Sequence, residues 1–176
     1  MTGDASPGAE YLEIIAKMEG DHERACRHLA EFIGQARPGS DGVMASWKSM
    51  LARDLYYLGR VDELDPLLEA ARASRHSVER TFVAAVEALL LSGAGAHDRA
   101  EERARAAVAT AETETDNVWL QGWSNEDLAL VLERAGRVDE AREALKRALG
   151  VWERKRCLPY VGRVREQIES LGRTRV

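Results

Sequence analysis

The chain has 176 residues, with 30 acidic and 25 basic side chains and a formal net charge of −5 at neutral pH. This length is enough for one domain with a hydrophobic core, and the well-mixed charge lacks the basic excess with which proteins bind nucleic acid. The most apolar run, residues 82–91, contains a glutamate and is too short to span a membrane. The first residues lack the basic and apolar segments of a secretory signal, and the two cysteines form no disulfide framework, so we expect a cytoplasmic protein.

Helical periodicity dominates the chain. Ala, Leu, Arg and Glu, all strong helix formers, are the prevailing residues, and no segment alternates as a strand does. The spacing of apolar residues predicts helices at residues 7–19, 22–36, 43–58, 61–74, 77–92, 97–114, 117–135, 138–156 and 159–171. The stretch 36–42 is the clearest break. Pro66 is tolerable early in its helix, although it could kink the start, and Pro159 opens the last helix.

A short junction recurs between predicted helices at intervals of roughly 40 residues, which is typical of stacked helical repeats. Its glycines are Gly20, Gly59, Gly95 and Gly136, each with an acidic residue at the third position after it. We interpret the glycine as a left-handed helix end and the acid as part of the next first turn, where it favours the positive end of the helix dipole. Ala25, Ala100 and Ala141 then leave room for close approach, so each junction predicts an antiparallel helical hairpin.

The last predicted helix has no later helix with which to pair. Its apolar side chains form one stripe, made of Tyr160, Val161, Val164, Ile168 and Leu171. A one-sided helix at the end of a stack covers the apolar face of the last repeat. We therefore expect residues 157–172 to form a capping helix.

The large and small residues around the junctions resemble the pattern of the tetratricopeptide repeat family. The fourth unit carries it through Leu128, Ala129, Leu132, Ala141, Leu145 and Ala148, and the second through Leu51, Ala52, Leu55, Leu68 and Ala71. The first unit departs most, because Glu13 stands where the family has a small residue. Residues 119–171 are most similar to the helical-repeat regions at the C-terminal end of large bacterial regulators, which carry ATPase, cyclase or DNA-binding modules elsewhere.

The resemblance implies an all-α fold, namely a right-handed α-solenoid of about four antiparallel helix pairs with a C-terminal capping helix. The units would lie near residues 7–36, 43–74, 77–114 and 117–156, between flexible tails at 1–6 and 173–176. It also implies a non-catalytic scaffold or regulatory module that binds a protein or peptide in its concave groove. Two alternatives stay open: a module that senses a ligand or peptide within a larger bacterial regulator, and a structural unit that forms homo-oligomers.

The family's groove positions, counted back from each junction glycine, give the candidate partner contacts. They are Lys17, Arg53, Tyr56, Trp123, Glu126 and Glu133. Tyr, Trp and Arg are enriched among residues that carry binding energy. Packing between neighbouring repeats is the competing interpretation for Tyr56 and Trp123.

The sequence shows little sign of catalytic chemistry. It contains no nucleotide-binding, hydrolase or metalloprotease motif, so we expect neither an enzyme nor a cofactor. His22, Cys26 and His28 form the one cluster of ligand-type residues, and zinc needs three or four ligands. We interpret Cys26 as a small apolar residue and His22 as a surface residue at a helix start, and we expect no metal. Cys157 follows three basic residues, but we interpret it as a partly buried cysteine at a turn.

Overall fold

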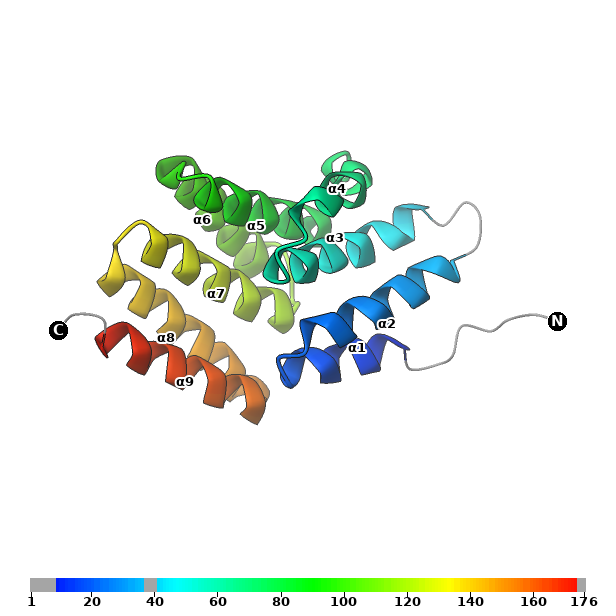
Figure 1. Cartoon of the computed structure of the whole chain (residues 1–176). Coiled ribbons are helices and arrows are strands. Elements are labelled where there is room, and N and C mark those ends of the chain that lie inside the picture. The colour runs from blue at the N-terminus through cyan, green and yellow to red at the C-terminus, as the bar shows by residue number, and fades with distance from the viewer. Residues whose placement is uncertain (1–8, 37–40, 174–176) are drawn as a thin grey trace. The chain divides into compact units, whose positions relative to one another are not determined.

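The computed structural model describes residues 9–36 and 41–173, and every regular element in these two stretches is helical (Figure 1). The predicted all-α class is therefore confirmed. The tail predicted at 1–6, most of the tail predicted at 173–176 and most of the break at 36–42 lie outside the described residues. The chain divides into two compact units, unit 1 ending at Val83 and unit 2 beginning at Ala84.

The helices follow the predicted order closely. Unit 1 contains α1 (Ala9–Met18), α2 (His22–Gly34), α3 (Asp41–Tyr57), the 3₁₀ turn η1 (Val61–Glu63) and α4 (Leu64–Arg72). The boundary between the units falls within α5 (Ser77–Gly93), and unit 2 continues with α6 (His97–Thr113), α7 (Val118–Arg134), α8 (Val138–Lys155) and α9 (Leu158–Arg173). Apart from α4, each observed helix begins and ends within about two residues of the prediction.

The helix predicted over 61–74 differs from the observed structure at its start. Pro66 has no N–H, so it cannot donate the hydrogen bond that a continuous α-helix from Val61 would need at this position. The chain forms the single turn η1 first, and α4 begins at Leu64. Pro66 then lies in the first turn of α4, where the backbone N–H groups need no partner within the helix.

All four junction glycines have the predicted left-handed conformation. Their φ angles are 75° at Gly20, 74° at Gly59, 78° at Gly95 and 76° at Gly136. At each one the glycine N–H donates to the carbonyl three residues back, and the next N–H donates to the carbonyl five residues back, at 2.9 to 3.1 Å. This pair of bonds is the Schellman motif, which ends a helix and turns the chain sharply.

Helices that follow one another in the chain pack together within each unit. In unit 1, α1 packs on α2, α2 on α3 and α3 on α4; in unit 2, α6 packs on α7, α7 on α8 and α8 on α9 (Figure 1). An ion pair of 3.6 Å joins Glu87 of α5 to Arg103 of α6. The alanines predicted to permit close approach, Ala25, Ala100 and Ala141, have no exposed surface.

The apolar stripe predicted on the last helix is buried. Tyr160, Val161, Val164 and Leu171 are buried and Ile168 is half-buried, while α9 packs on α8. The turn between these helices repeats the junction geometry without glycine, since Arg156 has φ 58° and its hydrogen bonds follow the same pattern. Cys157 lies at this turn, as predicted, and is buried rather than partly buried.

Candidate functional site

The structure places the six predicted partner contacts in two groups, and most of them are buried. Lys17, Arg53 and Tyr56 belong to unit 1, whereas Trp123, Glu126 and Glu133 belong to α7 in unit 2. The relative exposure is 1 % for Lys17, 4 % for Arg53, 3 % for Trp123 and 8 % for Glu126. Tyr56 is half-buried and Glu133 is exposed. Four of the six side chains therefore present little surface to a partner.

Lys17 belongs to a buried polar cluster that joins three helices of unit 1. Its ammonium forms an ion pair with Glu13 one turn earlier on α1, and it lies 3.0 Å from Asp54 Oδ2 of α3. His22 of α2 completes the cluster, with Nδ1–H donating to Asp54 Oδ1 at 2.9 Å. Glu13 and Asp54 have no exposed surface, so the charges of the cluster are held away from water.

The sequence contained a signal for this cluster. Glu13 stands at the small-residue position of the first unit, so its carboxyl group enters the space between helices and needs a partner there. Lys17 follows four residues later on the same helix face and supplies it. His22 was expected at the surface, but its hydrogen bond to Asp54 draws it into the structure and leaves its side chain 25 % exposed.

Arg53 and the two tyrosines at the end of α3 pack beside the polar cluster. The Arg53 guanidinium lies 5.0 Å from the centre of the Tyr57 ring, a cation–π contact. His22 stacks on the same ring with centroids 5.0 Å apart, and Tyr56 meets it edge-on at 5.8 Å. Arg53 is thus engaged in packing within unit 1, while Tyr56 keeps part of its surface.

Burial and neighbouring charges set the protonation of the cluster. Burial raises the pKa of the Glu13 carboxyl above its usual value, and the opposing attraction of Lys17 does not cancel this effect. Burial also opposes ionisation of Asp54, but Lys17, the His22 hydrogen bond and Arg53 together hold the pKa of Asp54 below its usual value. Desolvation disfavours charge on Lys17, yet Asp54 and Glu13 raise its pKa. We therefore assign an ionised Lys17–Asp54 pair, with Glu13 the carboxyl that protonates more readily.

Trp123 and Glu126 connect α7 to α8 and α9. Trp123 Nε1–H donates to the Tyr160 hydroxyl at 3.1 Å. Glu126 accepts from Trp152 Nε1–H at 2.8 Å through one carboxylate oxygen and from Arg163 at 2.7 Å through the other. Both side chains are thus occupied within unit 2.

An aromatic cluster surrounds these bonds. Trp152 stacks on Tyr160 with ring centroids 4.4 Å apart, and Trp119 lies 5.5 Å from Trp152. Two of these rings also make cation–π contacts. Arg163 Cζ lies 4.1 Å from the centre of the Tyr160 ring, and Lys155 Nζ lies 4.4 Å from the centre of the Trp119 ring. The geometry supports the packing interpretation that competed with partner contact for Trp123.

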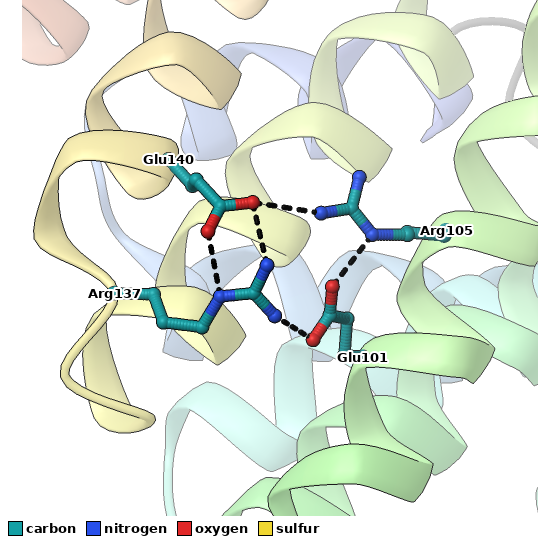
Figure 2. Close-up of polar contacts among 4 residues, drawn as sticks. All are labelled: Glu101, Arg105, Arg137 and Glu140. Atoms are coloured by element: carbon teal, nitrogen blue, oxygen red, sulfur yellow. Dashed lines mark hydrogen bonds and ion pairs between the residues drawn. The ribbon is translucent and has the colours of Figure 1, made fainter.

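A ring of four charged residues links α6 to the start of α8 (Figure 2). Arg105 contacts Glu101 at 2.7 Å and Glu140 at 3.2 Å. Arg137 contacts the same two carboxylates, at 2.7 and 2.6 Å for Glu140 and through an ion pair with Glu101. Each arginine bridges both acids, so the ring closes on itself. The pattern of junctions predicts acids at the helix starts, but it carries no signal for this contact between α6 and the α7–α8 junction.

The cysteine and histidine side chains were the candidates for reactive or metal-binding chemistry. Burial first, and then the charge of Asp54, raise the pKa of the Cys26 thiol to about 12, so the thiol stays protonated and a poor nucleophile. Cys26 is buried, as predicted. Within residues 9–36 and 41–173, no three His, Cys, Asp or Glu side chains come together as metal ligands would.

No protein-family model matches the chain, and no curated protein matches it. In the part of the chain that the structure describes, no helix has the length and apolar character needed to cross a bilayer.

Proposed function

We propose that the chain is a non-catalytic helical-repeat module that binds a protein or peptide partner and acts as a scaffold or regulatory domain. The observation that supports this most is the repetition of one junction, with the same φ angle and the same two hydrogen bonds, at four glycines. A chain built from repeated hairpins exposes extended surfaces rather than one enclosed site, and such surfaces serve mainly for binding.

We further propose a tetratricopeptide-like arrangement, a right-handed α-solenoid in which the first helix of each hairpin faces inward. In this arrangement α9 is the capping helix. The cytoplasm is the proposed location, and two free thiols, Cys26 and Cys157, suit its reducing conditions.

The accessible groove residues are the proposed contacts. Tyr56 in unit 1 and Glu133 in unit 2 keep exposed surface, whereas the other predicted groove residues are buried and can only support that surface. Arg53 packs beside the Tyr56–Tyr57 pair through its cation–π contact, and Glu126 holds α7 to α9 through Arg163. We therefore assign Lys17, Arg53, Trp123 and Glu126 to positioning the inner surface.

Affinity measurements on surface variants test this function. The partner is first captured by cross-linking and identified, and its affinity is then measured for Tyr56→Ala, Glu133→Lys and, as the matched control, Glu143→Lys on the second helix of its hairpin. We expect a loss of about tenfold or more for at least one inner-face variant and no change for the control. A partner that binds all three variants equally well would contradict the groove.

Self-association is a second candidate function, favoured by exposed apolar side chains on α1. Tyr11, Leu12 and Ile15 are 66 %, 49 % and 45 % exposed, although they are large apolar residues. A second copy of the chain would remove this surface from water. Light scattering over a concentration series is expected to show a mass that rises from the monomer towards the dimer. The variant Ile15→Glu is expected to keep the monomer mass at every concentration. A constant monomer mass for the unsubstituted chain as well would rule self-association out.

A further inference from the structure

The same five-residue sequence forms two junctions in this protein. Residues 59–63 and 136–140 both read Gly-Arg-Val-Asp-Glu. In each, the arginine grips the glutamate three residues later through Nε and one terminal nitrogen, at 2.6 and 2.7 Å for Arg60 and at 2.7 and 2.6 Å for Arg137. The two junctions therefore form the same bidentate Arg–Glu pair, which we call the fork.

In unit 2, a neighbouring helix occupies this fork. Glu101 and Arg105 of α6, one helical turn apart, contact the outer side of Arg137 and Glu140 and close the ring of Figure 2. The acid precedes the base on α6, so Glu101 meets the arginine of the junction and Arg105 meets its glutamate. This contact shows what kind of helix surface fits the sequence Gly-Arg-Val-Asp-Glu.

In unit 1, the corresponding helix lacks these charges. Counted from the junction glycine, the positions of Glu101 and Arg105 correspond to Cys26 and Ala30 of α2. Cys26 lies near the unit 1 junction, because its thiol interacts electrostatically with both Arg60 and Glu63. Glu23 at the start of α2 acts electrostatically on Arg60. A thiol and a methyl group at the two ring positions still cannot complete a ring of ion pairs, so the fork in unit 1 stays open.

The open fork is exposed and bordered by apolar side chains. Arg60 and Glu63 are each 50 % exposed, and among the described residues Arg60 has no hydrogen-bond partner other than Glu63. Val61 is 46 % exposed and Leu58 is 36 % exposed, whereas Val138, which corresponds to Val61, is half-buried. Arg137 and Glu140 themselves stay 38 % and 48 % exposed, so the two junctions differ in the exposure of the valine and in the ion pairs with a neighbouring helix.

We propose that the α3–α4 junction of unit 1, formed by Leu58, Arg60, Val61 and Glu63, docks a helix of a partner protein that presents a glutamate and, four residues later, an arginine. The inference rests on the proposed partner-binding function and adds a second contact surface to it. Charge complementarity selects the partner and its direction, and burial of Leu58 and Val61 supplies the apolar contact.

A peptide copy of α6 is the probe for this surface. The peptide spans residues 97–113 with blocked ends, and the full chain is labelled with ¹⁵N for amide chemical-shift measurements. We expect saturable shifts at residues 58–63. The identical sequence at 136–140 is an internal control, because Glu101 and Arg105 of α6 already form ion pairs with it, and its amides are expected to stay unchanged. Equal shifts at both junctions, or no shift at the highest soluble peptide concentration, would overturn the proposal.

Charge reversal separates specific docking from general stickiness. A peptide with Glu101→Arg and Arg105→Glu is expected to bind the chain about tenfold more weakly or worse. The protein variant Arg60→Glu with Glu63→Arg is expected to prefer this reversed peptide, with circular dichroism showing that it keeps its helix content. Binding that ignores both reversals would also overturn the proposal. Neither result depends on Tyr56 or Glu133, so failure here leaves the groove test of the proposed function intact.

Discussion

At the residue scale, Gly122 is the glycine of unit 2 at which an added Cβ atom would clash. A Cβ atom at this position of α7 would lie 2.1 Å from Cζ2 of Trp152, a side chain with no exposed surface. Trp152 is held by its hydrogen bond to Glu126 and its stack on Tyr160, so it cannot move away freely. We expect Gly122→Ala to lower the free energy of unfolding by about 1–3 kcal/mol or more in urea denaturation.

Gly162 gives a matched control for this substitution. It also lies within a helix, α9, but a Cβ atom there would meet nothing within 4 Å. Gly162→Ala should therefore raise the free energy of unfolding by about 0.5–1 kcal/mol, because alanine is the better helix former. A neutral Gly122→Ala would show that Trp152 does not pack against α7 in this way.

Lys17 is the residue whose loss should cost unit 1 most. Lys17→Met leaves the buried Asp54 carboxylate with less compensation for its missing hydration. We expect destabilisation of about 3–5 kcal/mol in chemical denaturation, as for other buried ion pairs that lose one member. Lys146→Met removes an exposed lysine from its pair with Glu143 and should change stability little. Equal effects of the two substitutions would contradict the buried cluster.

The two carboxyls beside Lys17 predict opposite pH dependences. Because folding lowers the pKa of Asp54, its contribution is present above pH about 4 and is lost as the pH falls below that value. Because folding raises the pKa of Glu13, the folded state holds this proton longer, and stability falls as the pH rises above about 4.5. Asp54→Asn should therefore flatten the curve of unfolding free energy against pH below about pH 4. Glu13→Gln should flatten the same curve above about pH 4.5. Curves of unfolding free energy against pH in which neither variant changes these slopes would refute the assignment.

At the element scale, the left-handed turns end the helices and set the hairpins. Gly59 has φ 74°, a conformation that costs other residues about 1–2 kcal/mol. Gly59→Ala should destabilise by roughly that amount, although a Cβ there meets no neighbour. Arg156 adopts the same conformation without being glycine, so Arg156→Gly should stabilise by up to about 1 kcal/mol. The same sign for both substitutions in thermal and urea unfolding would contradict the turn geometry.

The ring between α6 and α8 predicts an energetic coupling between two helices. A double-mutant cycle with Glu101→Gln and Arg137→Gln should give a favourable interaction at low salt, because the Arg137 guanidinium bridges Glu101 and Glu140. High salt should weaken this coupling, since the ring is partly exposed. Strict additivity of the two substitutions at low salt would show that the ring is not formed in solution.

At the scale of the whole molecule, the helices and their hairpin turns could be predicted because they depend on local chemistry. A glycine between two periodic apolar segments favours a left-handed helix end, and all four junction glycines have this conformation. The start of α4 was less predictable, since the position of one proline decides between an α-helix and a 3₁₀ turn.

The candidate site was harder to predict because it depends on contacts between distant residues. Lys17 has the spacing of a groove residue, but Asp54, which draws it inward, comes 37 positions later and carries no local mark. The burial of Glu126 has the same origin, because its two partners come from α8 and α9. Periodicity shows which face of a helix a residue occupies, but not what that face meets.

The most direct test of the account is an experimental structure of the full chain. We predict that Gly20, Gly59, Gly95 and Gly136 have positive φ angles, and that successive hairpins are related by rotations of one right-handed sense, as a solenoid requires. Hairpins that pack as separate bundles, or a junction glycine within a continuous helix, would contradict it.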